Sequence, residues 1–464
     1  MPRKSITPVA CIFLLLLCAT SCVEEITLQT CANDDDCPTL TICRSGRCFH
    51  EVPPWVVPPC SSPAREGRCC DLDPPVIPIG DPDCRLHLLT GSDALSAPAG
   101  TPTGEIVVAA REGSALSVIA VEPDGDEAWR ETLAGLSTGD LPVIRVDGDG
   151  RVYADRSASL WTRSPTGVVS SLDAGGTIDG GYAVCRGGVS VALVRGPDGR
   201  GLVRLDQAPG TWPLAGSLDR TPVLPPALSL PSEAIAVAWS DGTVTVHDLE
   251  TGVQRGLQQV IALEPAITDA DPDPVITSLA LDRTGHLWVS TSKGILERLS
   301  TSGDITADFL RFDLGSPAFT PPVLPGNGAA VIGLADGRIV RGSDLFSSTP
   351  ETLLTLVTAA PGSLSLLDGD GYLLLGDCPD GRCLSIFFGA PSSSFGAAFD
   401  LEGEHRHSGL PGDAAVGLPG PEGLATLVGG NRLDGLVVAG STRDAPWPGP
   451  DGGPGNGRCA ENAE

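Results

Sequence analysis

The stretch LALDRTGHLWVSTSKGILERL, from Leu279 to Leu299, carries the pattern that decides the fold of this 464-residue chain. Its apolar residues fall in three short runs, Leu279 to Leu281, Leu287 to Val289 and Ile295 to Leu299. A period of two is typical of β-strands, because successive side chains of a strand point to opposite faces of a sheet. Asp282 to Gly285 and Lys293-Gly294 separate the runs, and each ends in the glycine that a tight hairpin turn favours. The stretch therefore predicts three strands joined by two turns.

Looser copies of this hairpin unit recur between residues 85 and 445. Within each unit, a turn is expected between its first strands. The candidates, one for each unit, are Glu112-Gly113, Asp149-Gly150, Gly187-Gly188, Asp241-Gly242, Thr284-Gly285, Asp336-Gly337, Asp370-Gly371 and Gly430-Asn431. Their mean spacing is about 45 residues, and a four-stranded unit of that length is typical of a β-propeller blade. The sequence therefore predicts an all-β fold with a single β-propeller of seven or eight four-stranded blades.

Two of these units align with one another. TPVLP at residues 221–225 precedes AIAVAWSDGTVTV, and TPPVLP at residues 320–325 precedes AAVIGLADGRIV. Together with DLETGVQRG at residues 248–256, this pattern resembles the PQQ-like propeller repeat. A blade of the sensor-type and NHL-like propellers is similar to the opening stretch through Asp282, Gly285, Leu287, Trp288 and Val289. These resemblances cover roughly 360 residues and imply a propeller fold.

The first 22 residues, MPRKSITPVACIFLLLLCATSC, have the pattern of an export signal. Two basic residues precede an apolar core that is too short to span a bilayer permanently. Ala19-Thr20-Ser21-Cys22 resembles the lipobox of bacterial lipoproteins, which implies cleavage before Cys22 and a lipid on that cysteine. The alternative is an ordinary secretory signal with an incidental cysteine. Under both interpretations the chain is exported, and the lipoprotein resemblance implies an anchor at the outer membrane, on its periplasmic or cell-surface face.

The composition of the remaining chain changes in steps that predict its organisation. The segments that we expect are a signal peptide at 1–21, a lipid-anchored tether at 22–30, a cysteine-rich module at 31–48, a Pro- and Cys-rich spacer at 49–84, the propeller at 85–445 and a flexible tail at 446–464. The module CANDDDCPTLTICRSGRC resembles a small module near the N-termini of exported δ-proteobacterial and myxobacterial proteins. A piece this short cannot bury a core, so it needs covalent staples.

Export predicts that the cysteines of the mature chain form disulfides. The candidates are Cys31, Cys37, Cys43, Cys48, Cys60, Cys69, Cys70, Cys84, Cys378, Cys383 and Cys459. Together with Cys185 they number twelve, an even number that permits complete pairing. Zinc is the alternative for the module, but the module has no C-x-x-C pair. Residues 33–36 offer calcium ligands, and we interpret them as an acidic turn instead.

Two pairings follow from position along the chain. Cys378 and Cys383 flank a four-residue segment, so we expect them to lie opposite one another on two strands and to form a disulfide. A propeller must also join its first and last blades, because open sheet edges are a liability. We expect the strand Arg85 to Thr90 to complete the sheet of the hairpin at residues 423–440, and Cys459 to bridge that seam to Cys84 or to a neighbouring spacer cysteine.

Three other groups of residues have a chemical and a structural interpretation. Adjacent cysteines such as Cys69-Cys70 contact the quinone in PQQ-dependent dehydrogenases, but this pair precedes the blades, so we interpret it as two structural cysteines. His405 and His407 would share a face of a strand and hold a metal, or lie exposed in a loop, which we prefer. Asp147 to Gly150 and Asp368 to Gly371 lack the last ligand of a calcium loop, so we expect hairpins there.

The charge of the chain limits its partners. It has 58 acidic and 30 basic residues and a net charge of −28, so nucleic acid would be repelled. Loops on a rigid scaffold carry recognition, and we expect a non-catalytic binding or scaffolding lipoprotein of the bacterial cell envelope. The expected partners are the membrane, through the lipid anchor, and an envelope protein or a glycan. No catalytic residue, cofactor or metal site is predicted.

Propellers of this repeat type have several functions. One such propeller is a lipoprotein of the outer-membrane β-barrel assembly machinery, which has PQQ-like blades and no enzymatic activity. The cysteine module and the acidic composition of this chain differ from that protein, so its role is not carried over. The alternative to a binding protein is a propeller enzyme, either a quinoprotein dehydrogenase or a glycan hydrolase.

The lipobox resemblance leads to a prediction about membrane association. The Cys22→Ser variant cannot accept a lipid at this position, so we expect it to be released from the membrane fraction, whereas the wild-type protein is retained there. Cell fractionation followed by immunoblotting measures this. Recovery of the variant in the membrane fraction to the same extent as wild type would show that Cys22 does not anchor the chain.

Overall fold

The structure is a computed structural model of the chain. It describes residues 41–44, 47–50, 85–89, 91–122, 125–134, 141–197, 199–207, 220–260, 275–302, 309–325, 328–343, 349–355, 361–367, 371–378, 381–388, 397–400, 414–416, 424–429, 432–437 and 458–461. Of these described residues, those within 41–50, 85–87 and 354–437 have only their backbone described, apart from Leu433. The chain divides into two compact units, Met1–Glu51 and Val52–Glu464. None of the described residues belongs to a helix with the length and hydropathy of a membrane span.

The first unit contains an antiparallel hairpin of β1 (Thr41–Arg44) and β2 (Arg47–His50). The register places Cys43 opposite Cys48. Directly opposed residues of an antiparallel pair have Cα atoms about 4.5–5.5 Å apart, which is within the reach of a disulfide. The sequence predicts only that both cysteines form disulfides and leaves their partners open, and Cys31 and Cys37 lie outside the described residues.

The described strands of the second unit form eight mainly antiparallel sheets, which we number as blades 1 to 8. Blade 1 consists of β4 (Ala94–Leu95), β5 (Ala99–Gly100), β6 (Ile106–Glu112), β7 (Ala115–Val121) and β8 (Glu127–Thr132), and blade 2 of β9 (Ile144–Val146), β10 (Val152–Asp155), β11 (Ser159–Arg163) and β12 (Val169–Asp173). Blade 3 consists of β13 (Thr177–Val184), β14 (Ser190–Gly196) and β15 (Gly199–Arg204), and blade 4 of β16 (Ala227–Ser229), β17 (Ala234–Ala238), β18 (Thr243–Asp248) and β19 (Gln254–Gln259).

Blades 5 to 8 complete the series. Blade 5 consists of β20 (Ile276–Leu281), β21 (His286–Thr291), β22 (Ile295–Ser300) and β23 (Leu310–Asp313), and blade 6 of β24 (Ala329–Gly333), β25 (Arg338–Ser343) and β26 (Glu351–Thr355). Blade 7 consists of β27 (Pro361–Leu367), β28 (Gly371–Cys378), β29 (Gly381–Phe388) and β30 (Ala397–Asp400), and blade 8 of β31 (Ala414–Val416), β32 (Leu424–Gly429), β33 (Arg432–Val437) and β3 (Arg85–Leu89). A last strand, β34 (Cys459–Ala460), joins the sheet of blade 4.

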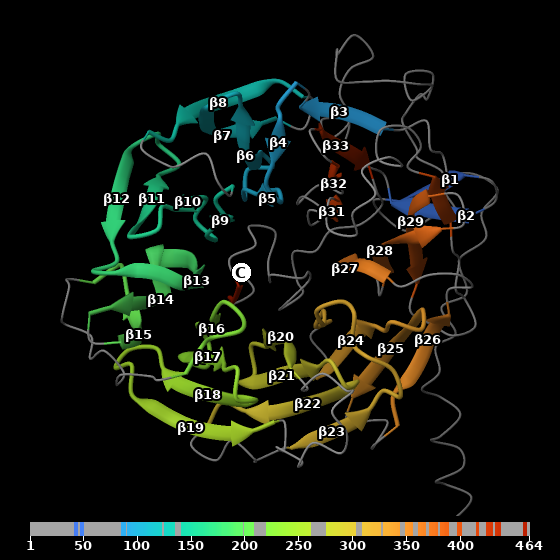
Figure 1. The fold of residues 1–464 in the computed structure, drawn as a ribbon. Coiled ribbons are helices and arrows are strands. Elements are labelled where there is room, and N and C mark those ends of the chain that lie inside the picture. The colour runs from blue at the N-terminus through green and yellow to red at the C-terminus, as the bar shows by residue number, and fades with distance from the viewer. Residues whose placement is uncertain are drawn as a thin grey trace, which may run out of the picture. The chain divides into compact units, whose positions relative to one another are not determined.

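The blades of this unit follow one another around a ring (Figure 1). The inner strands β5, β9, β13, β16 and β20 contact one another in that order, and β27 contacts both β24 and β31. Blades 5 and 6 meet where Gly342 faces the ring of Phe312, because a Cβ on that glycine would lie only 3.1 Å from it. Contact between β33 and β4 then joins blade 8 to blade 1. The predicted β-propeller is confirmed, with eight blades among the described strands.

Blade 5 shows how the opening stretch specifies its strands. The carboxylate of Asp282 accepts hydrogen bonds from the backbone N–H groups of Thr284 and His286, at 2.9 and 2.7 Å, and so holds the first turn closed. Gly285 has φ +88°, a conformation that a residue with a Cβ rarely adopts. The resulting strands bury Trp288 against Phe312, with ring centroids 6.4 Å apart. The local pattern and the packing therefore favour the same three strands.

The ring closes as the sequence predicts. Strand β3 pairs antiparallel with β33, with Arg85 opposite Leu436 and Leu89 opposite Leu433. The N-terminal strand is thus the outer strand of the C-terminal blade. Leu88 and Leu433 are 3% and 0% exposed, and they pack in one cluster with Leu95, Ile106 and Val108 of blade 1. This cluster joins the two ends of the propeller sequence.

Two predictions about local geometry are wrong. Of the turns expected between first and second strands, those at Glu112, Asp241 and Gly430 connect the second and third strands instead. Strands β28 and β29 place Cys378 opposite Gly381 and Cys383 opposite Gly376, so the two cysteines are not directly opposed. The turn between the strands contains two residues rather than four, so the cysteines are diagonal neighbours, about 7–8 Å apart. Their disulfide stays a prediction.

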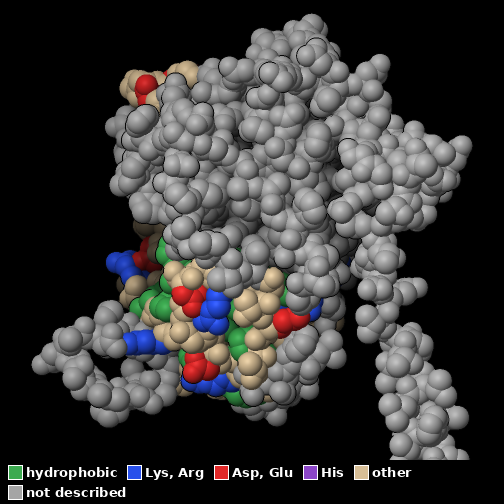
Figure 2. Space-filling view, turned by 90° about the vertical axis from the view of Figure 1, so that its right-hand side faces the viewer, with side chains coloured by type: hydrophobic (Ala, Val, Ile, Leu, Met, Phe, Trp, Pro, Cys, Tyr) green, Lys and Arg blue, Asp and Glu red, His purple; other side chains and the backbone are tan. Residues whose placement is uncertain are grey.

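Acidic and basic side chains lie next to one another on the part of the surface that is coloured in Figure 2. Ion pairs on the outer strands and turns include Arg338 with Asp336 at 2.8 Å and Arg341 with Glu351 at 2.5 Å. Such exposed pairs contribute only about 0–1 kcal/mol each. We therefore attribute the stability of the ring to the apolar contacts between blades and to its closure.

The closure predicts different effects for two leucines. Leu88→Ala removes a buried side chain from the seam, so it should lower the free energy of unfolding by about 2–5 kcal/mol. Leu257→Ala on the outer strand β19, where this leucine is 42% exposed, should change it by only about 0.5 kcal/mol. Denaturant unfolding of both variants measures this. Equal stabilities for the two variants would contradict the closure.

Candidate functional site

One face of the ring carries the turns between the first and second strands of the blades, and we call it the AB face. In blade 2 this turn is Asp147–Gly150. The carboxylate of Asp147 accepts the N–H groups of Asp149 and Arg151, at 3.0 and 2.9 Å, and the hydroxyl of Tyr153 at 3.0 Å. The turn is thus a hairpin held by its own aspartate, as the sequence predicts.

The corresponding turn of blade 3 begins with a cysteine. Cys185 follows β13, and a short 3-10 turn, η3 (Arg186–Gly188), leads to β14. Gly187 and Gly188 both have positive φ, 79° and 77°, and a Cβ on Gly188 would crowd the guanidinium of Arg151. The backbone N–H of Gly187 donates to Asp149 at 2.7 Å, which ties the turns of blades 2 and 3 together.

The four residues Arg458–Glu461, near the end of the chain, lie against these turns. We call them the C-terminal segment. Within it, β34 pairs in parallel with β16, the first strand of blade 4, with Leu228 opposite Cys459. The N–H groups of Leu228 and Leu230 donate to the carbonyls of Arg458 and Ala460, at 2.8 and 3.1 Å. In Figure 1 this strand lies in the middle of the ring, beside β16. Within the predicted flexible tail, residues 458–461 around Cys459 are therefore held against a sheet.

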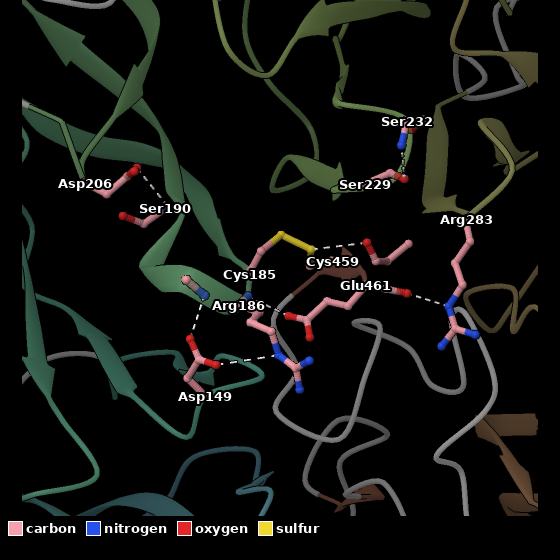
Figure 3. Close-up of a disulfide and its surroundings, with 12 residues drawn as sticks. Asp149, Cys185, Arg186, Ser190, Asp206, Ser229, Ser232, Arg283, Cys459 and Glu461 are labelled. Carbon is pink, nitrogen blue, oxygen red and sulfur yellow. Dashed lines mark hydrogen bonds and ion pairs between the residues drawn. A yellow bond between two sulfur atoms is a disulfide. The ribbon is translucent and has the colours of Figure 1, made fainter. Parts of the chain in front are cut away.

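A disulfide between Cys185 and Cys459 fixes the C-terminal segment to blade 3, and Figure 3 shows it beside Arg186 and Glu461. The two Cα atoms are 5.5 Å apart. This pairing corrects the predicted bridge from Cys459 to Cys84 or another spacer cysteine. The reason is that the tail lies along the inner edge of blade 4, where the end of β13 is its neighbour, rather than at the seam of the ring.

The last residue of the C-terminal segment contacts three blades. Oε1 of Glu461 accepts the backbone N–H of Arg186 at 2.7 Å, and Nε of Arg283 donates to the backbone carbonyl of Glu461 (Figure 3). A Cβ on Gly148 of blade 2 would overlap Oε2 of Glu461. Gly148, Arg186 and Arg283 therefore form a fitted place for this residue.

Burial changes the acidity of this region. It raises the pKa of Glu461, and the N–H of Arg186 offsets only part of that effect. Burial likewise raises the pKa of Asp147, despite its hydrogen bonds from the turn. At Asp282 burial acts in the same direction, but hydrogen bonds from the ring and N–H of His286 outweigh it and hold the pKa below its ordinary value. The acidic groups beside the C-terminal segment thus differ in how readily they lose a proton.

A recess of about 400 Å³ adjoins the C-terminal segment on the AB face, between blades 3 and 4. Its lining residues are Val189, Arg204, Gln207, Leu230, Glu233, Leu249 and Glu250. Arg204 is already engaged, because it pairs with Asp206 at 3.1 Å and donates to the carbonyl of Leu249 at 3.1 Å. The recess is therefore lined by apolar side chains and by two carboxylates.

Of the cysteines proposed from sequence, only Cys459 has a described side chain. The backbone of Cys43, Cys48, Cys378 and Cys383 is described, whereas Cys22, Cys31, Cys37, Cys60, Cys69, Cys70 and Cys84 lie outside the described residues. His405 and His407 also lie outside them. Within the described part of the chain, no three His, Cys, Asp or Glu side chains lie close enough to share a metal ion.

Sequence analysis missed Cys185 as a disulfide partner. It counts among the twelve cysteines of the exported chain, but its partner is 274 residues away. The available signal was the position of Cys185 two residues before Gly187-Gly188, a tight turn at the end of a first strand. That signal would have indicated a cysteine on the AB face, but not its partner.

Comparisons with known proteins agree with the fold. No protein-family model matches the chain, and no curated protein is similar to it in sequence. The C-terminal WD40 domain of Sif2 is similar in structure, with a TM-score of 0.50 and 10% identity over 76% of this chain and 98% of that domain. BamB from Moraxella catarrhalis gives 0.46 and 13%, over 75% and 99% of the two chains. A catalytically inactive virginiamycin B lyase from Staphylococcus aureus gives 0.44 and 12%, over 76% and 98%. The likeness to the Sif2 domain supports the propeller fold alone.

The disulfide predicts a covalent contribution to stability. Replacing both cysteines, in Cys185→Ser/Cys459→Ser, frees a loop of 274 residues in the unfolded chain. By the chain-entropy argument this should lower the free energy of unfolding by up to about 5 kcal/mol. Thermal and denaturant unfolding of wild type and variant without reductant measures this. Identical unfolding of the two proteins would show that the bridge does not stabilise the fold.

Proposed function

We propose that this chain is an exported, lipid-anchored binding or scaffolding propeller of the bacterial cell envelope, and that it uses the recess between blades 3 and 4 to bind a segment of another envelope protein. The observation that carries the proposal is the recess itself, because it is built from turns of two blades that a disulfide and hydrogen bonds hold in place. Loops on a rigid scaffold are suited to recognition.

The disulfide supports the location. Cys185 and Cys459 are 0% and 6% exposed, so their bond belongs to the packed interior of the ring. Disulfides of this structural kind form and persist in oxidising compartments, which include the bacterial periplasm and the cell surface. The signal pattern that ends at Cys22 supports the same location and supplies the anchor.

The lining of the recess indicates the chemistry of its ligand. Leu230 and Leu249 form apolar surface, and Glu233 and Glu250 add negative charge. Among the described lining residues there are two carboxylates and one guanidinium, which pairs with Asp206, and this excess of acidic groups agrees with the net charge of −28. Complementary charge favours partner choice and rapid association. A peptide segment with a basic side chain beside apolar ones fits this lining best.

The recess predicts a selective response to loss of charge. In an array of surface-immobilised peptides, the wild-type chain should prefer basic peptides with apolar residues. Glu233→Gln/Glu250→Gln should bind them about tenfold more weakly, a loss of about 1.4 kcal/mol. Glu131→Gln on the outer strand β8 is the control, because it removes a carboxylate that is 39% exposed and distant in the sequence from the recess.

Four results would contradict this function. Selection of acidic or neutral peptides, or equal binding by the double variant and the control, would show that the recess does not recognise basic segments. Turnover of a glycan, or quinone-dependent oxidation by the purified chain, would instead favour the enzymatic alternative.

A further inference from the structure

The C-terminal segment is bound in the way that a separate peptide binds to a sheet edge. Its two residues Cys459–Ala460 are extended and add a strand to β16, Arg458 precedes them with φ 55°, and the carbonyls of Arg458 and Ala460 accept the N–H groups of Leu228 and Leu230. Strand addition of this kind is a common mode of peptide recognition, in which the backbone contributes affinity and pockets for alternate side chains contribute specificity. The C-terminal segment has such pockets.

The first pocket holds the arginine. Arg458 is only 4% exposed, and its guanidinium donates to the carbonyl of Pro226 at 3.0 Å and to the carbonyl of Leu279 at 3.4 Å. These acceptors belong to blades 4 and 5. A buried charge is tolerated only where it is hydrogen-bonded, so this pocket is matched to a guanidinium.

The following positions select size and charge. Ala460 is 0% exposed and belongs to the core cluster of blades 4 to 6, which leaves no room for a larger side chain. Glu461 fits against Gly148, which lacks the Cβ that would overlap Oε2. Its carboxylate accepts from Arg186, and its carbonyl accepts from Arg283. The site thus fits arginine, then a small residue two positions later, then an acidic residue.

The remaining residue, Cys459, is the one member of the C-terminal segment that a covalent bond attaches to the site. Cys459 is tied to Cys185, and its neighbours are held by non-covalent contacts alone. A dithiol reductant transfers two electrons and two protons to the S–S bond, which breaks to give two thiols, while the reductant forms its own disulfide. After that step, the C-terminal segment is a peptide held by a strand edge and side-chain pockets.

We propose that the inner edge of β16, with the surrounding turns of blades 2, 3 and 5, is a peptide-binding site for extended segments with the pattern Arg-x-small-acidic, and that the C-terminal segment is its built-in ligand. The disulfide keeps this ligand in place, and its reduction opens the site to the same class of peptide from outside. This site goes beyond the recess, which it adjoins through Leu230.

A peptide-exchange experiment tests the proposal. The protein is the full chain with Cys459→Ser and with a protease site inserted between residues 445 and 446, which frees the tail without reducing other disulfides. The folded protein is cleaved and the tail is removed by gel filtration. The probe is the fluorescein-labelled peptide GRSAENAE, which is residues 457–464 with the same serine, and anisotropy measures its binding.

Four results are expected. The cleaved protein binds the probe saturably at concentrations below about 1 mM, whereas the uncleaved wild-type chain does not bind it. The reversed peptide EANEASRG, which has the same composition, binds at least tenfold more weakly. The Arg458→Ala peptide is also at least tenfold weaker, because it leaves the carbonyls of Pro226 and Leu279 without the guanidinium. Near-UV circular dichroism of the cleaved protein remains that of the folded chain.

A substitution in the protein gives a matched control. Gly148→Ala places a methyl group where Oε2 of Glu461 lies, so it should weaken the probe at least tenfold. The Gly148→Ala protein and the protein with Gly148 should bind the Glu461→Ala peptide equally well. This compensation requires the peptide to occupy the position of the C-terminal segment, and a purely structural role of the tail would not produce it.

Several outcomes would overturn the proposal. They are failure of the folded, cleaved protein to bind the probe, equal binding of the reversed peptide, and loss of the near-UV signal when the tail leaves. The last outcome would make the tail a structural strand of blade 4. Binding of basic peptides at the recess is measured separately through Glu233 and Glu250, so either site can fail alone.

Discussion

The pairing of β3 with β33 is the contact on which the rest of the ring depends. Each blade buries its faces against two neighbours, so an open ring would expose a face of blade 1 and a face of blade 8, and without β3 the edge of β33 would be unpaired. The N-terminal strand removes that edge by completing blade 8. Leu88 and Leu433 then join the core cluster of blade 1, which converts a chain of sheets into a closed structure.

The two ends of the described second unit are fixed in different ways. The N-terminal strand lies on the outside of blade 8, where hydrogen bonds and leucine packing hold it. The C-terminal segment lies on the inside of blade 4, where a disulfide and charged contacts hold it. Leu230 belongs to both sites, because its N–H donates to the C-terminal segment and the same residue lines the recess. The position of the C-terminal segment therefore shapes one wall of the recess.

The sequence predicts what neighbouring residues determine. The stretch from Leu279 to Leu299 specifies the strands of blade 5, because its alternation and its Asp-Gly turns act over a few residues. It does not distinguish a turn between first and second strands from a turn between second and third, since both need the same glycine. The partner of Cys459 is 274 residues away, and only the closed ring brings Cys185 beside it. The recess is equally non-local, because its walls come from separate turns of blades 3 and 4.

The chemistry of the C-terminal segment indicates recognition rather than simple anchoring. A disulfide alone would hold the tail, and apolar neighbours would fill the space at less cost than a buried guanidinium and carboxylate, whose burial must be offset by well-placed partners. Arg458 and Glu461 have such partners in the carbonyl of Pro226 and the N–H of Arg186. A shift of one residue would exchange the sides of the strand and place cysteine in the arginine pocket. The charged residues therefore specify one register, and selection of one register is what a sequence-selective peptide site requires.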